Sequence, residues 1–429
     1  MSTLDQFDLR ETGTRECPFP YFRAIRAECP VYFMREIGAF YVSRYEDVRH
    51  VKRHPELFSN DIWTYGARRG AVRDIAEEYR AEHGWKRVST LQRTDPPVHT
   101  TYRRLIGDAF GVARVRRMTD YVETIVNDLL DGFIDRGRCD FVAEFAVPLP
   151  CTVIADQLGV PREAIGKLKA WSDAMLAPGS GFLGEDEALA CGKLVVEAQH
   201  FFAEVMAARR QSPRDDIISD LVHTKVRDAT TGEERLLDMY ELQDLLDQLL
   251  TGGNETTTNA LGSAMLLLLE HPAQMARLRA EPALVRNFIE ETLRVETPVL
   301  HLWRAATRDT EIAGVPIPAG SAIALGYASA NRDEKVFDDG ETFDVGRKKS
   351  GAHLAFGSGP HHCPGAALAR QELYSAFTVL LHRLDDIRLA QPEVRPTHVP
   401  SIFLRGLERL NLAFTAREWA RYLPNESAY

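Results

Sequence analysis

Residues 356–365 have the sequence FGSGPHHCPG, and the apolar, helix-forming run AALA follows directly. The glycines at positions 357, 359 and 365 let backbone N–H groups approach a bulky group closely. Cys363 lies where the predicted helix begins, and that position stabilises a thiolate. Amide hydrogen bonds to a cysteine sulfur also set the potential of an iron that the sulfur holds. The loop is therefore suited to an iron-bound cysteine.

Two other interpretations of this loop stay open on its residues alone. A lone Cys-Pro-Gly is most often a buried cysteine in a glycine-rich turn. A zinc site could use His361, His362 and Cys363, but three consecutive residues rarely converge on one tetrahedral centre, and the sequence has no evident second pair of ligands.

The composition of the 429-residue chain, with 45% hydrophobic and 27% charged residues, excludes a fibrous or largely disordered protein. Lys and Arg number 52 against 62 Asp and Glu, and the formal charge of -10 argues against a general nucleic-acid binder or a binder of anionic membranes. A local basic face is still compatible with this charge. Six scattered cysteines without a CxxC pair indicate a reducing compartment.

The chain has no sequence signal for export or membrane insertion. No uncharged apolar run reaches the roughly 20 residues of a spanning helix, and the polar, acidic residues 1–10 have neither a signal core nor a transit pattern. We therefore expect a cytoplasmic protein. The length favours two or three domains, but no repeat, low-complexity segment or linker divides the chain. A single large domain over residues 1–429 fits better.

Hydrophobic periodicity predicts a mainly α fold with a small β portion. Aromatic and β-branched residues beside turn signals predict hairpins over residues 32–45 and 310–325. The charged stretch 59–94 has helix-like pieces but no clear apolar face, which indicates a long, mobile, partly helical loop. Apolar residues recur at helical spacing over residues 97–136, 162–177, 187–211 and 238–270.

The complete loop pattern F-G-x-G-x-H-x-C-x-G is matched at every specified position and resembles the haem-binding loop of the cytochrome P450 family. The resemblance implies the P450 fold, with Cys363 as the axial thiolate ligand of a haem b. It also implies that Gly357 and Gly365 shape the loop and that Phe356 packs near the sulfur. His362 is less typical of the family, and either alters the redox potential or is a solvated bystander.

A second motif lies in the helix expected over residues 238–270. The stretch 250–258, LTGGNETTT, places two adjacent glycines in a helix, each costing about 1 kcal/mol relative to alanine. Such a violation indicates either a function or a break at which Asn254 caps a second helix. The stretch resembles the family's distal motif [AG]-G-x-[DE]-T-[TS], with Gly252 in place of the commoner alanine. The resemblance implies that Glu255 admits protons and that Thr256 stabilises the dioxygen that the haem binds.

Charged residues form two further motifs of the family. Glu291 and Arg294 are spaced i,i+3 and share a helical face, although most such pairs are solvated surface contacts. They resemble the family's E-x-x-R helix, and residues 343–347, FDVGR, resemble the segment that supplies a third partner, Arg347. The resemblance implies a buried structural network. Residues 95–104, DPPVHTTYRR, resemble a segment that meets a haem propionate, and the implied propionate ligands are His99, Arg103, Arg304 and His361.

Matching the motifs in this way implies a substrate pocket that is mostly apolar, with one or two hydrogen-bonding groups. A terpenoid, a steroid or an aromatic compound of moderate size would suit it. The stretch 59–94 is expected to close over this pocket. The expected pocket residues are Gln248, Thr251, Gly252, Leu300, Leu302, Phe403 and Leu404.

The resemblance implies a haem-thiolate monooxygenase that inserts one atom of O2 into a small, largely apolar organic substrate, by hydroxylation or oxidative demethylation. The sequence has no G-x-G-x-x-G between a strand and a helix, so we expect no bound flavin or nicotinamide. Electrons then come from a separate ferredoxin or flavodoxin with its reductase. We expect a monomer without nucleic-acid or membrane partners, and its redox partner should dock on a basic proximal face made of Arg103, Arg104, Arg114, Arg116, Arg117, Lys348 and Lys349.

Two alternative functions remain at this point. One is a peroxygenase that uses H2O2 directly, against which the pair Glu255 and Thr256 argues, because that chemistry needs no such proton relay. The other is a haem protein that binds or senses a ligand without turnover.

Overall fold

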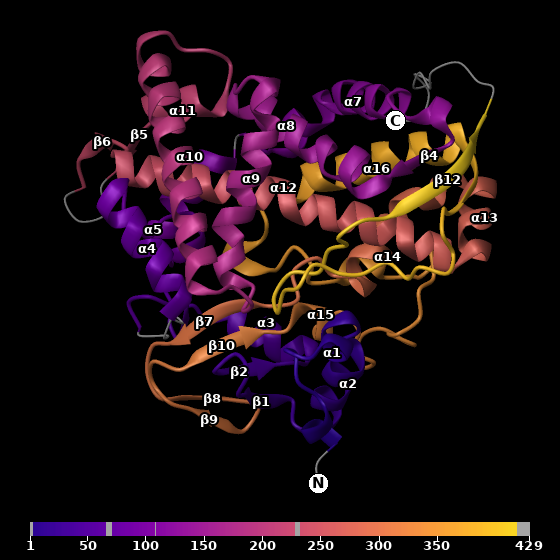
Figure 1. Ribbon diagram of the computed structural model, residues 1–429. Helices are drawn as coiled ribbons and strands as arrows, with labels where there is room; N and C mark the ends of the chain where they lie inside the picture. The colour runs from indigo at the N-terminus through magenta and orange to yellow at the C-terminus, as the bar shows by residue number, and fades with distance from the viewer. Residues whose placement is uncertain (1–2, 66–70, 108, 228–231, 418–429) are drawn as a thin grey trace.

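The computed structural model describes residues 3–65, 71–107, 109–227 and 232–417, and it is mainly helical with a small β portion, which confirms the predicted fold class (Figure 1). The helices are α1 (Thr12–Glu16), α2 (Phe19–Glu28), α3 (Tyr45–Arg53), α4 (Ala71–His83), α5 (Val98–Gly107), α6 (Val112–Arg117), α7 (Thr119–Asp131), α8 (Pro148–Leu158), α9 (Ile165–Leu176), α10 (Glu185–Gln211), α11 (Ile217–His223), α12 (Met239–Glu270), α13 (Pro272–Ala280), α14 (Val285–Val295), α15 (Tyr327–Ala330) and α16 (Ala366–Arg383). The strands are β1 (Val31–Met34), β2 (Ala39–Val42), β3 (Phe58–Ser59), β4 (Arg138–Asp140), β5 (Lys225–Arg227), β6 (Glu234–Leu236), β7 (Leu302–Ala306), β8 (Thr310–Ile312), β9 (Val315–Ile317), β10 (Ala322–Leu325), β11 (Leu384–Leu389) and β12 (Asn411–Ala416).

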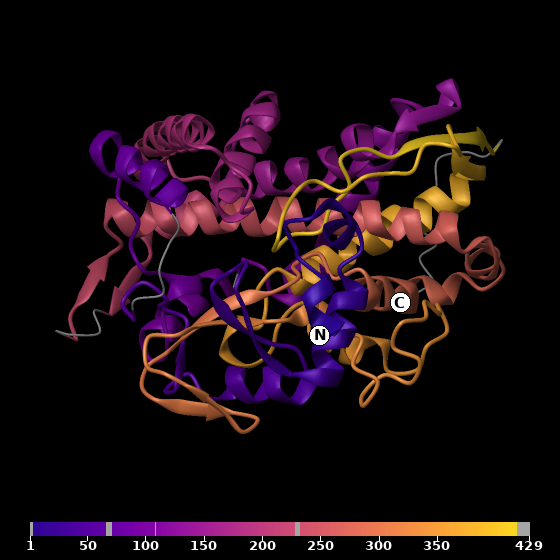
Figure 2. The same cartoon turned by 60° about the horizontal axis from the view of Figure 1, so that its bottom comes forward.

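Helix α12 runs across the width of the molecule, with α8, α9 and α10 on one side and the main sheet on the other (Figure 2). A capping box starts the helix: the side chain of Asp238 accepts from the N–H of Glu241, and Glu241 accepts from the N–H of Asp238 at 2.8 Å. The helix continues without interruption to Glu270, so the alternative of a break capped by Asn254 is wrong. Asn254 is fully buried and accepts a hydrogen bond from the thiol of Cys151 instead.

The two glycines of α12 have different surroundings. A Cβ at Gly253 would lie 3.3 Å from the side chain of Ile154, so this glycine lets α8 pack closely. A Cβ at Gly252 would meet no atom within 4 Å. The helix therefore presents an open face at Gly252.

The main sheet has the strand order β1-β2-β10-β7-β3. Strands β1 and β2 form the first predicted hairpin. The second was correct only over β8 and β9, because β10 pairs with β2 and β7 rather than with β9. The apolar residues Ile323, Ala324 and Leu325 of β10 are fully buried in the centre of the sheet, which explains why β10 pairs there and not with β9.

The stretch 59–94 is more ordered than a loop. It contains the 13-residue helix α4, which lies against α10: a Cβ at Gly192 would be 3.2 Å from the carbonyl oxygen of Ala76. Periodicity gave no clear apolar face here because Arg80, a charged residue, points into the protein and is 1% exposed. Residues 66–70 of this stretch lie outside the described part.

The region 97–136, predicted to be helical, forms three helices, α5 to α7, and Gly111 adopts an extended conformation before α6. Most of the helices share one hydrophobic core, and two smaller clusters lie around the main sheet. Within the described residues, none of the helices combines the length and the hydropathy that a membrane crossing requires.

Candidate functional site

The cysteine loop is folded back on itself before α16. The N–H of Cys363 donates to the carbonyl of Phe356 at 2.8 Å, and Gly357 and Gly359 both have a φ of +68°, which glycine adopts without strain. Burial raises the pKa of the Cys363 thiol, while the N–H groups of Gly365 and Ala366 and two nearby guanidinium groups lower it. A metal cation at the sulfur would complete this partial stabilisation of the thiolate.

The side chains around the loop hold its shape. The guanidinium of Arg370 lies 4.4 Å from the ring centre of Phe356, and it also pairs with Glu290 of α14 at 2.6 Å. Glu290 also lies 3.2 Å from His353. Although Glu290 is largely buried, these hydrogen bonds lower its pKa to about 2. No local pattern in the sequence indicated this role of Glu290, because its partners come from outside its own helix.

The structure brings the four expected propionate ligands together. The rings of His99 and His361 have centroids 3.9 Å apart. Arg304 is 5% exposed, and its guanidinium donates to the neighbouring carbonyl of Trp303 at 2.7 Å. Burial, Arg304 and His99 lower the pKa of His361 to about 2, and its Nε2 is buried without a hydrogen-bond partner. Burial also lowers the pKa of Arg103, while Cys363 raises it.

A further cation, which the sequence analysis missed, joins this group. Lys52 of α3 is buried, and its Nζ donates to the hydroxyl of Tyr327 at 2.9 Å. The sequence does indicate that Lys52 is buried, because Tyr45, Val48 and Lys52 share one helical face and the first two are apolar.

These groups fit a haem. In the described part of the chain, no carboxylate forms an ion pair with Lys52, Arg103 or Arg304. Lys52 and Arg304 are buried and Arg103 is half-buried. Cations that lack counterions in such places suit the two carboxylates of a haem, and the half-buried sulfur of Cys363 suits its iron. No group of three or more His, Cys, Asp or Glu side chains suited to a metal ion occurs among the described residues, which disfavours the zinc alternative. The residues of the site thus fit a haem-thiolate protein.

The distal motif lies on the open face of α12. The hydroxyl of Thr256 donates to the carbonyl of Gly252 at 3.0 Å. Thr257 and Thr258 are buried, and Thr258 donates to the carbonyl of Ala146 instead. The carboxylate of Glu255 lies 3.3 Å from the Nζ of Lys169 on α9. Burial raises the pKa of Glu255, and Lys169 opposes this effect.

The three expected structural charges are in contact. Arg294 and Arg347 approach Glu291 at 2.8 and 2.9 Å, and Glu291 and Arg294 are fully buried. Arg294 also donates to the carbonyls of Asn331, Gly340 and Thr342. The network therefore ties α14 to the segment that precedes the cysteine loop.

Several expected pocket residues have their polar groups already engaged. The amide of Gln248 donates to the hydroxyl of Thr90 at 2.7 Å and to Asp244 at 2.6 Å, and accepts from the N–H of Gln92 at 2.8 Å. Thr251 donates to the carbonyl of Asp247 within the helix.

The other expected pocket residues include apolar side chains from two distant segments. Leu300 is buried, and its N–H donates to the carbonyl of Phe403 at 2.8 Å. Leu302 is half-buried in β7, and Leu404 bridges to the backbone of Val299. The structure thus brings residues 299–300 into contact with residues 403–404.

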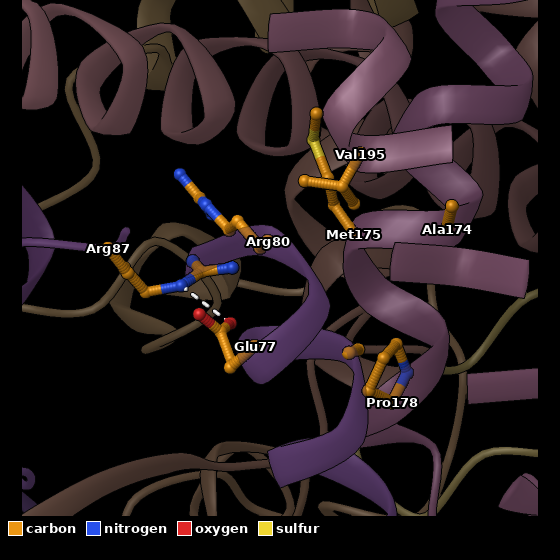
Figure 3. A pocket seen from close by; sticks show the side chains of 8 residues that line it. Glu77, Arg80, Arg87, Ala174, Met175, Pro178 and Val195 are labelled. Carbon is orange, nitrogen blue, oxygen red and sulfur yellow. Dashed lines mark hydrogen bonds and ion pairs between the residues drawn. The ribbon is translucent and has the colours of Figure 1, made fainter. Parts of the chain in front are cut away.

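A small cavity of about 20 Å³ lies between α4, α9 and α10 (Figure 3). Arg87 is paired with Glu77 at one side, and the guanidinium of Arg80 points away from that pair. Arg80 pairs at 2.8 Å with Asp247 of α12, and Arg93 pairs at 3.2 Å with Asp244. We call Arg80, Arg93, Asp244 and Asp247 the α12 clasp, because these ion pairs fasten residues 80–93 to α12.

Comparison with known proteins identifies the family of the chain. Residues 183–399 match the family model "Cytochrome P450". The chain is 35% identical over 372 residues to "Putative cytochrome P450 YjiB" of Bacillus subtilis, covering 85% of this chain and 86% of the relative. It is also 35% identical over 413 residues to a "Steroid C26-monooxygenase" of Mycobacterium tuberculosis, covering 96% and 97%. The structure of cytochrome P450 CYP109Q5 from Chondromyces apiculatus superposes with a TM-score of 0.81 at 33% identity, covering 96% and 98%.

The chain belongs to the cytochrome P450 family. It has the P450 fold in a single domain, and it is a P450 monooxygenase, an oxidoreductase whose cofactor is a haem iron.

Proposed function

We propose that this enzyme binds haem b through Cys363 and uses O2 to hydroxylate a small, largely apolar organic substrate, with electrons from a separate ferredoxin. The observation that carries the proposal is the pair of Thr256 and Gly252 on the open face of α12. A hydroxyl that bonds its own helix can turn toward a ligand in the same groove. A peroxygenase or a ligand sensor does not need this arrangement beside a buried acid.

The protein supplies positioned protons in this proposal. The haem, when bound, supplies the oxygen chemistry, which the electron donation of a thiolate ligand favours. Thr256 Oγ1 offers a hydrogen bond at the open face. Burial keeps the pKa of Glu255 above its ordinary value, so its carboxyl holds a proton up to a higher pH than a solvated acid does. Lys169 fixes the position of that carboxyl.

The substrate in this proposal is recognised mainly by shape and apolar contact. Since Gln248 and Thr251 use their polar groups within the protein, the wall near Gly252 offers few free hydrogen bonds. Leu300, Leu302 and Phe403 add apolar surface. The similar structure of CYP109E1 from Bacillus megaterium is a complex with testosterone, and another relative is named a steroid C26-monooxygenase. Steroids and terpenoids are therefore the first compounds to screen, by the shift of the Soret band that follows displacement of water.

The redox partner is proposed to dock beside α6. Arg116 and Arg117 are exposed there, and Lys348 and Lys349 are exposed on the segment that follows the Glu291 network. Val112, at 59% exposure, adds an apolar contact at the start of α6. A basic patch on an acidic protein suits an acidic ferredoxin.

All six cysteines are unpaired, which supports a cytoplasmic enzyme.

One experiment tests the proposal in two stages. The reduced CO complex should absorb at the long wavelength typical of thiolate ligation, and Cys363→Ser should lose that band. With a ferredoxin, its reductase and a compound that shifts the Soret band, the enzyme should then convert NADPH and O2 into hydroxylated product. Turnover with H2O2 alone, and none with NADPH, would reinstate the peroxygenase alternative.

A further inference from the structure

Lys52 has an unusual environment for a lysine. It lies on the inner face of α3 and is 5% exposed, and its Nζ donates to the hydroxyl of Tyr327 at 2.9 Å. The same Nζ lies 5.2 Å from the centre of the Tyr327 ring. No ion pair of Lys52 occurs in the described ranges of the chain. An ammonium group in such a place needs a compensating anion.

The ammonium group lies directly against the cysteine loop. A Cβ at Gly357 would be 2.9 Å from the Nζ of Lys52, and a Cβ at Gly359 would be 3.2 Å from its carbonyl oxygen. Both glycines therefore leave the room that Lys52 occupies. The lysine thus lies beside the loop that ends at Cys363.

The charges around Lys52 are positive. Burial and the nearby Arg304 lower the pKa of Lys52, and Tyr327 opposes them. Burial alone would raise the pKa of Tyr327, but Lys52 and Arg304 lower it. The acid that acts on Arg304 is Asp95, and its carboxylate already accepts from the side chain of Ser59 and the N–H of Asn60. No carboxylate of the described residues forms an ion pair with Lys52 or Arg304, although Asp95 acts on Arg304 from beyond ion-pair distance.

We propose that Lys52, held in place by Tyr327, is an additional ligand for a carboxylate of the haem. This inference rests on the haem binding proposed above and goes beyond the four ligands expected from the family motifs. The lysine binds the carboxylate and Tyr327 positions the lysine. Removing the positive charge then weakens haem retention and lowers the reduction potential, because a nearby cation favours the reduced haem.

The test compares holoenzymes of the wild type, Lys52→Met, Lys52→Arg and Tyr327→Phe, with the exposed Lys225→Met as the matched control. Methionine keeps much of the apolar stem of lysine and removes its charge together with its N–H donors. Three measurements are made: resonance Raman spectra of the propionate bending mode, the rate of haem transfer to excess apomyoglobin, and the reduction potential. For Lys52→Met we expect a shifted propionate mode, haem loss faster by about tenfold, and a lower potential. Lys52→Arg should resemble the wild type, Tyr327→Phe should lie between, and Lys225→Met should change nothing.

Two results separate the possible failures. If the wild type lacks the thiolate CO band, the proposed haem ligation itself is wrong. If that band is present while Lys52→Met leaves the Raman mode and the haem-loss rate unchanged, Lys52 serves only packing and the inference is overturned. Should Lys52→Met not yield folded protein, Tyr327→Phe decides alone, because an unchanged propionate mode in that variant also overturns the inference.

Discussion

The α12 clasp leads to a prediction about stability and pH. In Arg80→Met, Asp247 keeps its buried position but loses the guanidinium that lies 2.8 Å away. The side chains of Arg80 and Asp247 are 1% and 4% exposed, so solvent cannot replace the partner. Removing one member of a buried pair costs about 3–5 kcal/mol.

The part of this loss that comes from the unpaired charge of Asp247 cannot exceed the cost of protonating its carboxyl, and this upper limit (the ceiling) depends on pH. Without Arg80, Asp247 keeps Arg87 as a second nearby cation. Its carboxyl can take up a proton instead of remaining charged, and this proton uptake costs about 1.36 kcal/mol for each pH unit above its ordinary pKa. With an ordinary pKa of 3.8, the ceiling is about 4 kcal/mol at pH 7 and about 1.6 kcal/mol at pH 5. Burial already raises the pKa of Asp247, and Arg80 holds it down. Arg80→Met therefore raises this pKa further, and the destabilisation grows as pH rises from 5 to 7.

Urea unfolding followed by circular dichroism at pH 5 and pH 7 measures the difference. The double variant Arg80→Met with Asp247→Leu should recover more than half of the loss at pH 7, because it removes both charges of this pair and leaves neither of them unpaired. Arg308→Met, at an exposed position, is the control and should have no effect. An equal loss at both pH values, or no recovery in the double variant, would refute the reasoning.

Three further predictions concern turnover. Thr256→Ala should still consume NADPH but release most of the electrons as H2O2. Its control, Thr257→Ala at a buried position, should keep NADPH consumption coupled to product formation. Measuring O2, NADPH, H2O2 and product together checks this, and fully coupled turnover in Thr256→Ala would contradict it. Glu255→Gln should slow turnover by about 10²-fold or more, since a positioned general acid contributes that much, and a turnover rate equal to that of the wild type would contradict this role. Arg116→Glu should slow electron transfer from ferredoxin at low salt but not at high salt, because salt screens exposed charges over a Debye length of about 8 Å at physiological ionic strength; a rate independent of salt would contradict docking beside α6.

The sequence predicts best those features whose cause is local. Helices α9, α10 and α12 follow from apolar spacing within each segment, and the first hairpin follows from the turn between β1 and β2. The contact of Glu291 with Arg294 is also local, since a spacing of three residues places both on one face.

Features that depend on distant segments could not be predicted in this way. Lys52 and Tyr327 are 275 positions apart, and nothing in either segment names the other. Helix α4 looked irregular because its buried position holds Arg80, whose partner Asp247 lies on α12. Strand β10 was assigned to the wrong partner because neither β2 nor β7 adjoins it in sequence.

The three hydrogen bonds of Gln248 restrict how this protein can change. One side chain satisfies a hydroxyl, a carboxylate and a backbone N–H that belong to two separate segments. A replacement without an amide loses all three hydrogen bonds at once, although Thr90 and Asp244 still bond each other and Gln92 lies at an exposed position. Each lost hydrogen bond costs about 0.5–1.5 kcal/mol. Position 248 should therefore tolerate few substitutions in a mutant library, although it borders the expected pocket. Leu300 and Leu302 engage no polar partner through their side chains, so new substrate preferences are more accessible there, both to laboratory selection and to natural drift.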